Sequence, residues 1–306
     1  MSAVREAGYR LLGRRLDYFL HLRPAEWPIM AAHTAVGYLL AVGVAGAATG
    51  AQAAPALVGL VLWVVCLNGG TLALNSAFDR DEGDVAYLRR PPVPPRYLAG
   101  FSIALMAAGQ ILAFRLPAPY PMLYAVCSVL SVAYSVPPLR LKAVAGADWI
   151  INMWGFGTLT PYAGWAATGV PIEPARGLVL LGFCPLFAAL YPLTQLYQLE
   201  EDRRRGDRTL ACVLGVRRSL SAALGAAALA FLLFGAAGLR AGWRTGATDL
   251  WRWGGVLLAL LAWSVVLLPW RRRFGRMTPG EHQRGMYRAL GAWAITDVVV
   301  VLAWGT

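Results

Sequence analysis

The stretch that decides the fold runs from Asn75 to Arg90 and reads NSAFDRDEGDVAYLRR. It follows directly on an apolar run over residues 56–78. Carboxylates are hard oxygen ligands that suit Mg²⁺, and acidic residues at the end of a membrane segment are costly unless they serve a site. The stretch therefore predicts a membrane helix that ends in a cation-binding site, with a cluster of acidic residues at Asp79, Asp81, Glu82 and Asp84.

The composition supports a membrane protein. The chain has 306 residues, of which 58% are hydrophobic and 14% are charged, whereas a soluble domain carries about 25% charged residues. The net charge of +12 follows the membrane topology described below, so we expect no nucleic-acid partner. The four cysteines are scattered without CxxC spacing, which predicts neither a disulfide framework nor a zinc site.

An apolar segment of about 20 residues can cross a bilayer, and the sequence predicts nine such segments in an all-α domain over residues 25–306. Residues 1–24 precede them as an amphipathic stretch in which arginines alternate with apolar side chains, the pattern of a helix that lies in the headgroup layer. The nine predicted segments are residues 27–49, 55–78, 97–115, 119–136, 148–168, 176–199, 217–239, 250–269 and 286–304.

The distribution of lysine and arginine predicts the orientation of this bundle in the membrane. If the nine segments alternate in direction, one side receives the N-terminus and every loop that carries an acidic cluster. That side also receives all but five of the 28 lysines and arginines, so the positive-inside rule predicts that it is cytoplasmic. The expected protein is a multi-pass component of the cell inner membrane with its C-terminus outside. The arginines left on the outer side are Arg115, Arg176, Arg240, Arg244 and Arg252.

A second acidic cluster lies in the stretch TQLYQLEEDRRRGDRTL, residues 194–210, and contains Glu200, Glu201, Asp202 and Asp207. On one continuous helix, Gln195, Gln198 and Asp202 would share a face. Amides at membrane depth are costly unless they face a cavity or a partner. The stretch therefore predicts the other half of a metal site, or alternatively a hydrogen-bond ladder between helices with no catalytic role.

A third polar segment, YSVPPLRLK, covers residues 134–142 and contains the chain's single lysine, Lys142. Lys142 and Arg140 can bind phosphate as a point charge and as a fork, respectively. The alternative is ordinary positive-inside charge. Asp148 follows, and either orients Lys142 or a metal-bound water, or simply lies where a helix N-terminus favours a carboxylate. His33 and Asp297 lie inside predicted membrane segments, where we expect them to form hydrogen bonds within the bundle.

The two acidic clusters, Lys142 and Arg140 together suit the binding and release of a diphosphate. Two acidic faces, Mg²⁺ and a few cations can hold a diphosphate and neutralise the charge that develops as it leaves. When the carbon that loses diphosphate is allylic, a carbocation results, and an apolar bundle keeps water from it.

On these residues the sequence resembles the UbiA-type intramembrane prenyltransferase superfamily along nearly its whole length. The signature NDxxDxxxD is matched at Asn75 and Asp79, while Ser76 replaces an aspartate and the last aspartate comes one place late, at Asp84. The pair Arg90-Pro91 and the GDxTL-like run over residues 206–210 also match. Gln198 stands where the family has an aspartate, so the number of metal ions is left open.

The resemblance implies a bundle of nine helices around a central cavity, open to the cytoplasmic side, in which Mg²⁺ and a prenyl diphosphate bind. The implied reaction transfers the isoprenoid chain to a lipophilic acceptor, aromatic or quinone-like. A terpene cyclase without an acceptor, and a non-catalytic transporter or binding protein for an anionic lipid, are the alternatives. The implied metal ligands are Asp79, Glu82, Asp84, Glu201 and Asp202. The implied diphosphate ligands are Asn75, Arg90, Arg140, Lys142 and Gln198. The implied catalytic residues are Asp79, Asp202, Lys142, Tyr134 and Tyr197.

Overall fold

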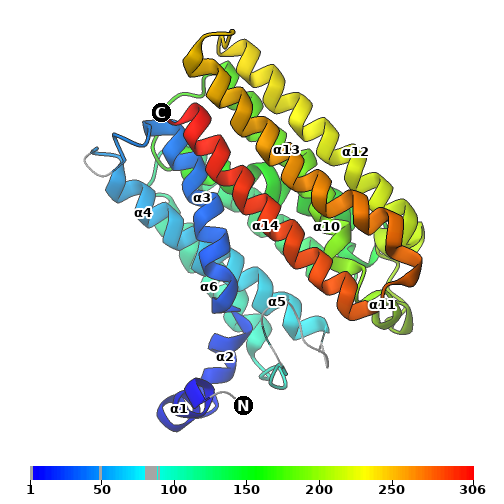
Figure 1. Cartoon of the computed structure of the whole chain (residues 1–306). Helices are drawn as coiled ribbons and strands as arrows, with labels where there is room; N and C mark the ends of the chain where they lie inside the picture. Colours follow the sequence, from blue (N-terminus) through cyan, green and yellow to red (C-terminus); the bar gives the residue numbers. More distant parts are fainter. Residues whose placement is uncertain (1–2, 48–49, 80–87, 89) are drawn as a thin grey trace.

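The computed structural model describes residues 3–47, 50–79, 88 and 90–306. Over these ranges the chain is a bundle of helices (Figure 1), and the only pairing between extended segments is an isolated bridge between Val144 and Arg208. The predicted all-α fold is therefore confirmed.

The N-terminal third begins with short helices that lie at one end of the bundle (Figure 1). In this part of the chain the helices are α1 (Ala3–Leu12), α2 (Arg15–His21), a 3₁₀ turn (Pro24–Glu26), α3 (Trp27–Val42), α4 (Ala53–Val61), a π-helical segment (Leu62–Gly69), α5 (Gly70–Asp79) and α6 (Leu98–Ala113).

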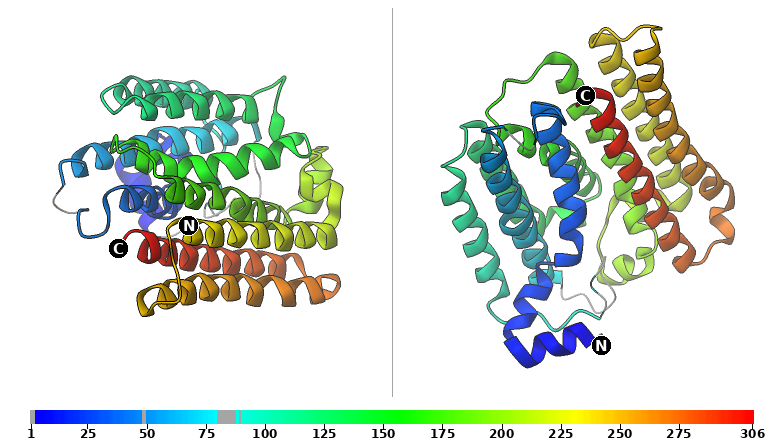
Figure 2. Two further views of the ribbon diagram at one scale, coloured as in Figure 1. Left: turned by 90° about the horizontal axis from the view of Figure 1, so that it is seen from above. Right: turned by 60° about the vertical axis from the view of Figure 1, so that its left-hand side comes forward.

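The remainder contains the longest helices, which lie side by side in both views of Figure 2. They are α7 (Pro119–Ser135), a 3₁₀ turn (Leu141–Ala143), α8 (Ala147–Asn152), a second π-helical segment (Met153–Leu159), α9 (Thr160–Ala166), α10 (Pro174–Gln195), α11 (Leu199–Arg205), α12 (Leu210–Arg240), α13 (Ala247–Arg273), a 3₁₀ turn (Phe274–Arg276) and α14 (Pro279–Trp304).

Five helical stretches of the described chain are long and apolar enough to cross a membrane, which identifies an integral membrane protein. They are Ala53–Asp79, Pro174–Gln195, Leu210–Arg240, Asp249–Arg276 and Pro279–Trp304. The other predicted segments are also helical, but α3 and α6 have 16 residues and α7 has 17, while the segment near 148–168 is divided by its π-helical part.

The sixth predicted segment differs from the structure at its end. Helix α10 stops at Gln195 and a new helix, α11, starts at Leu199. Gln198 is the residue before α11, and its backbone (φ −108°, ψ 5°) lies outside the helical region. The expectation that Gln195, Gln198 and Asp202 share one continuous helix is therefore wrong, because tertiary contacts rather than helical spacing bring them together.

Two hydrophobic clusters fill the bundle. The larger joins α10, α12, α13 and α14, with Phe183 packed edge to face against Phe234 and at a tilt against Trp293. The smaller joins α4, the first π-helical segment, α6, α7 and α9 around Trp63, Tyr120 and Tyr124. Helices α3 and α9 lie between the two clusters.

His33 and Asp297 form a buried pair that ties these parts together, as predicted for hydrogen bonding within the bundle. His33 Nδ1 lies 3.0 Å from Asp297 Oδ1, and its Nε2 lies 3.1 Å from the carbonyl oxygen of Gly157. Because the Gly157 carbonyl can only accept, Nε2 carries a proton. The pair joins α3 and α14 to the second π-helical segment.

Helices α3 and α9 approach each other closely at two glycines. A side chain at Gly37 would meet the backbone oxygen of Pro161, and one at Gly164 would meet the backbone oxygen of Thr34. Backbone atoms cannot rotate away as a flexible side chain can. Small residues at this contact therefore set the distance between the two helices.

This contact generates a prediction for stability. Gly164→Ala should lower the free energy of unfolding by about 1–3 kcal/mol, because the added methyl group forces the helices apart. The matched control is Gly100→Ala in α6, where a Cβ meets no atom within 4 Å. That variant should be as stable as the parent or slightly more stable, since alanine favours helix. Thermal unfolding in detergent measures both, and an unchanged Tm for Gly164→Ala contradicts the proposed close contact.

Candidate active site

A polar cavity of about 210 Å³ lies where α5 ends and α11 begins. It brings together the three polar segments of the sequence, which are far apart along the chain. Its lining residues are Arg23, Asn75, Asp79, Tyr134, Lys142, Tyr191, Thr194, Gln195, Tyr197, Gln198, Asp202, Asp207 and Thr209.

Asn75 and Asp79 line one wall of this cavity. They are four residues apart on α5, so the helical spacing alone places them on one face. Lys142 Nζ forms an ion pair with Asp79 Oδ2 and donates a hydrogen bond to Asn75 Oδ1 at 3.3 Å. The Asp79 and Lys142 side chains are only 5% and 11% exposed, so water screens this pair weakly.

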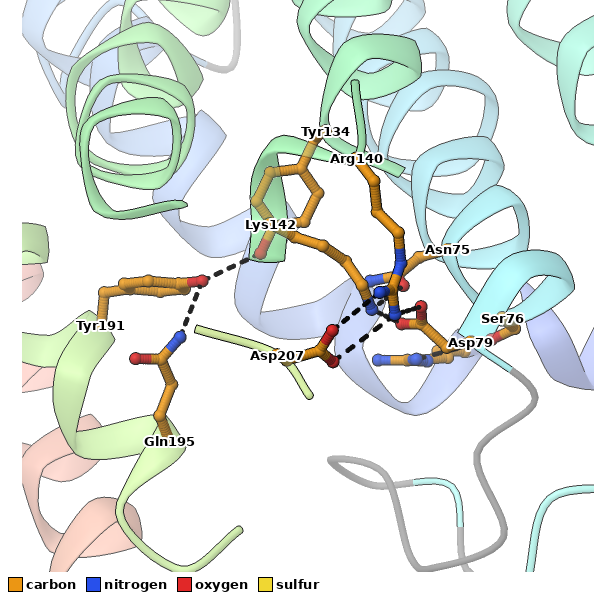
Figure 3. A network of polar contacts seen from close by, with 10 residues as sticks. Asn75, Ser76, Asp79, Tyr134, Arg140, Lys142, Tyr191, Gln195 and Asp207 are labelled. Carbon is orange, nitrogen blue, oxygen red and sulfur yellow. Dashed lines mark hydrogen bonds and ion pairs between the residues drawn. The ribbon is translucent and has the colours of Figure 1, made fainter. Parts of the chain in front are cut away.

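Arg140 connects this wall to the second acidic cluster (Figure 3). Its Nη1 donates to Asp207 Oδ1 at 2.7 Å, and its Nη2 lies 3.4 Å from Asp207 Oδ2 and 3.5 Å from Asp79 Oδ1. One guanidinium thus bridges carboxylates from two distant parts of the chain. The bridge is reinforced at the backbone, where the N–H of Arg208 donates to the carbonyl oxygen of Ala143 at 3.2 Å.

A tyrosine pair closes the opposite side of the cavity. Tyr134 Oη lies 2.9 Å from Tyr191 Oη, and Gln195 Nε2 donates to the Tyr191 oxygen at 3.1 Å (Figure 3). Tyr191 was not among the predicted site residues. It lies within an apolar helix, and the sequence carries no signal that separates it from a core tyrosine.

The carboxylate of Asp148 accepts hydrogen bonds next to this tyrosine pair. It is fully buried and accepts hydrogen bonds from Gln195 Nε2 at 3.1 Å, from the N–H of Leu210 at 3.0 Å and from the N–H of Gly146 at 2.9 Å. These contacts join α8, α10 and the start of α12. Asp148 therefore satisfies N–H groups at the starts of α8 and α12, and its side-chain hydrogen bonds go to Gly146, Gln195 and Leu210 and not to Lys142.

An apolar cavity of about 140 Å³ adjoins the polar one, and Asn75 and Tyr134 line both. No charged side chain is among its lining residues in the described chain. The other lining residues are Met30, Trp63, Leu67, Asn68, Thr71, Leu72, Cys127, Leu130, Ser131, Ile151, Asn152, Gly155, Phe156 and Thr160. A polar compartment is thus joined end to end with an apolar, aromatic one.

Arg23 is a further cation of the polar cavity, and it lies outside the sequence motifs. It is 7% exposed, and its Nη2 lies 3.5 Å from Ser76 Oγ, on α5 beside Asn75. Its backbone is left-handed (φ 51°), which turns the chain between α2 and α3. Glu26 lies 3.7 Å away, and burial raises the pKa of that carboxyl despite the nearby guanidinium. In the sequence Arg23 was indistinguishable from the other N-terminal arginines.

The other predicted residues take different places. Gln198, Tyr197 and Asp202 line the polar cavity, and burial raises the pKa of Tyr197 to about 12, so its phenol stays protonated at neutral pH. Arg90 is exposed, its carbonyl oxygen accepts a hydrogen bond from Arg5, and it is not among the lining residues. Glu201 is half-buried and also absent from the lining. Glu82 and Asp84 lie outside the described residues.

The donor set of the cavity fits Mg²⁺ in one particular way. Among the described residues, no three acidic, histidine or cysteine side chains are grouped closely enough to hold an ion by themselves. Mg²⁺ is usually bound by one or two carboxylates together with substrate phosphates and water. The carboxylates of Asp79 and Asp202, with amide oxygens from Asn75 and Gln198, supply hard oxygen ligands of that kind on the walls of one cavity.

Known structures share this fold. A UbiA homologue from Archaeoglobus fulgidus bound to GPP and Mg²⁺ has a TM-score of 0.66 at 19% identity, over 94% of this chain and 99% of that chain. A structure concerned with digeranylgeranylglyceryl phosphate synthase has a TM-score of 0.68 at 12% identity, over 95% of this chain and 98% of that chain. At these identities the similarity establishes the fold alone.

Sequence relatives add a family assignment. A lycopene elongase/hydratase from Halobacterium salinarum is 28% identical over 73% of this chain and 80% of the relative. A digeranylgeranylglyceryl phosphate synthase from Natronomonas pharaonis is 31% identical over 56% of this chain and 62% of the relative. Residues 36–289 match the UbiA prenyltransferase family, a range that contains every lining residue of the two cavities except Arg23 and Met30. The chain therefore belongs to the UbiA prenyltransferase family.

Proposed function

We propose that the protein transfers an isoprenoid chain from a prenyl diphosphate to an uncharged lipophilic acceptor, with Mg²⁺ as cofactor. The single observation that carries this proposal is the joining of a polar, charge-lined cavity to an apolar one at Asn75 and Tyr134. A prenyl diphosphate has the same division, with an anionic head and a hydrocarbon tail. Its reacting carbon would lie at the junction, next to Tyr134.

The head would bind among the cations. Lys142 and Arg140 hold Asp79 and Asp207 in the structure, and Arg23 lines the same cavity. Mg²⁺, when bound by Asp79 and Asp202, would neutralise charge on the leaving diphosphate. Lys142 and Arg140 would then be available to donate to phosphate oxygens, and Asn75 and Gln198 can contact the head from the same walls.

The reaction breaks the bond between the allylic carbon and the diphosphate oxygen, and the electron pair stays on diphosphate. The carbocation that forms lies beside aromatic rings, which stabilise cations through their faces. Trp63, Phe156 and Tyr134 line the apolar cavity, and the packed bundle around it limits the access of water. The acceptor then supplies an electron pair to form the new bond and loses a proton.

The acceptor is constrained by the absence of charge in the apolar cavity. A carboxylate or phosphate placed among its described lining residues would have no cation to pair with, and burying an unpaired charge is expensive. The part of the acceptor that enters this cavity is therefore neutral. The named relatives act on a carotenoid and form a glyceryl phosphate lipid, so a polyene or a lipid alcohol stands beside the aromatic or quinone-like acceptor expected from the sequence.

The proposed placement in the membrane follows from charge. Nine segments cross the bilayer, and the polar cavity and the N-terminus face the cytoplasm. The positive-inside distribution of arginine supports this orientation. The exposed apolar side chains of α1, such as Val4 and Leu11, support its placement at the headgroup layer.

The function is tested by measuring diphosphate release from geranyl, farnesyl or geranylgeranyl diphosphate with the purified protein. Release should require Mg²⁺ and an added acceptor, and EDTA should stop it. The acceptors to compare are lycopene, a geranylgeranyl glyceryl ether and a quinol. Release of a hydrocarbon without an acceptor would instead indicate a cyclase, and no release with any acceptor would favour a non-catalytic lipid-binding protein.

Asp79 provides a second test. Asp79→Asn keeps the size of the side chain but removes the charge that would bind Mg²⁺, so kcat should fall at least about 100-fold. The control Glu6→Gln removes an exposed carboxylate from α1 and should leave turnover unchanged. If Asp79→Asn retains near-full activity while folding normally, the metal assignment is wrong.

Lys142 provides a third test. Lys142→Arg keeps the charge but replaces a compact ammonium with a planar fork, so the KM for prenyl diphosphate should rise about tenfold. The control Arg288→Lys makes the reverse exchange at an exposed position of α14 and should leave KM unchanged. An unchanged KM in Lys142→Arg would show that Lys142 only neutralises Asp79.

A further inference from the structure

A second polar pocket lies at the other end of the bundle. Helix α10 carries Gln195 in the catalytic cavity at one end and Arg176 in this pocket at the other, which are about 29 Å apart along the helix axis. That distance matches the hydrocarbon thickness of a bilayer, about 30 Å. The pocket has a volume of about 460 Å³ and is far from the proposed chemistry.

Three arginines from three different helices converge on this pocket: Arg176 of α10, Arg240 of α12 and Arg252 of α13. The sequence places only five arginines on this side of the predicted topology, so their convergence is not a consequence of abundant charge. The Arg176 and Arg252 side chains are only 27% and 21% exposed. They are built into the pocket wall, unlike freely solvated surface arginines.

Two of these arginines each pair with a carboxylate three residues before them in the sequence. Arg176 pairs with Glu173 at 3.2 Å and Arg252 pairs with Asp249 at 3.5 Å. Their other contacts are to backbone oxygens, with Arg176 Nη2 donating to Trp304 and Arg252 Nη2 donating to Thr306. Two of the three guanidinium groups thus have a carboxylate partner, and that of Arg240 has none among the described residues.

Several hydrogen-bond donors around the pocket have no partner among the described residues. Arg240 makes no hydrogen bond or ion pair there, and Arg252 Nε and Trp304 Nε1 are buried without an acceptor. Trp304 is 5% exposed. Helix α10 also begins here without a side-chain cap at Glu173, so its first N–H groups add donors for an anion.

The aromatic residues place this pocket at the headgroup level. The Arg252 guanidinium lies 5.6 Å from the Trp243 ring and 5.8 Å from the Trp251 ring, and Trp243 stacks on Trp304 at 4.4 Å. Tryptophan gathers where the hydrocarbon core meets the headgroups. Leu250 and Leu257, which flank Arg252 along α13, are 57% and 54% exposed and offer apolar contacts for an acyl chain.

We propose that this pocket binds the phosphate of an anionic phospholipid headgroup in the leaflet opposite the catalytic cavity. A phosphodiester carries one negative charge and several acceptor oxygens, which suit the unpaired guanidinium of Arg240 and the unsatisfied N–H groups of Arg252 and Trp304. The three arginines and the N-terminus of α10 supply the donors, while Trp243 and the exposed leucines of α13 contact the glycerol and acyl part. The same phosphate chemistry could be met by free phosphate, so the experiment has to separate the two sources.

The test uses the full-length protein in a nonionic detergent. Native mass spectrometry and thermal unfolding would be recorded during titration with phosphatidylglycerol, phosphatidylcholine and inorganic phosphate. We expect saturable binding of phosphatidylglycerol with a rise in Tm, and binding of phosphatidylcholine at least about fivefold weaker. Arg240→Gln should weaken phosphatidylglycerol binding about fivefold, the factor expected for one basic residue near an anionic lipid.

Arg240 is suited to this test because it is exposed, so its substitution should leave the lipid-free Tm unchanged. Arg176→Gln is the second variant and should weaken binding in the same direction. The matched control is Arg115→Gln, which removes an exposed charge beyond the end of α6 and outside the pocket, and should not affect binding. Equal binding of the two lipids, equal loss in Arg115→Gln, or inorganic phosphate binding as tightly as the lipid would each overturn the proposal.

Discussion

The polar end of the bundle depends on neutralising carboxylates that the fold buries. Asp79 and Asp207 are separated widely in sequence, and both side chains are 5% exposed. An unpaired buried carboxylate would cost several kcal/mol, so each needs a cation. Lys142 and Arg140, from one short connection between α7 and α8, supply both. These two side chains therefore hold α5, the connection itself and the start of α12 around a single cavity.

The same ion pairs explain how a cavity for a highly charged ligand can be stable when empty. Its cations and carboxylates compensate one another, with the tyrosine pair and Asp148 fixing the surrounding backbone. In the proposed reaction, Asp79 would hold Mg²⁺ together with Asp202, and Lys142 and Arg140 would donate to the diphosphate in place of their present carboxylate partners. The charges are already positioned by folding, so little reorganisation is needed when the substrate arrives.

Site residues that share a helix face can be predicted from their spacing in the sequence, whereas those brought together by tertiary contacts cannot. The pair Asn75 and Asp79 follows from helical periodicity, and the single lysine at 142 follows from composition. The break between α10 and α11 does not, because residues 196–198 contain no glycine or proline that would signal it, and the contact of Gln195 with Asp148 joins residues 47 positions apart. Arg23 was equally hidden, since its left-handed backbone and its approach to Ser76 depend on the docking of α2.

The two π-helical segments account for the polar residues deep in the membrane. A π-helical turn redirects side chains and frees backbone carbonyls, which lipid cannot satisfy. In the second segment the Gly155 carbonyl accepts from Thr160 Oγ1 at 2.9 Å, and Trp63 Nε1 of the first segment lies 3.3 Å from the same hydroxyl. The Gly157 carbonyl accepts from His33, which Asp297 holds in place. Asp297 thus acts through His33 on Gly157, the residue after Phe156 of the cavity lining, and helps to fix the irregular backbone beside the apolar cavity.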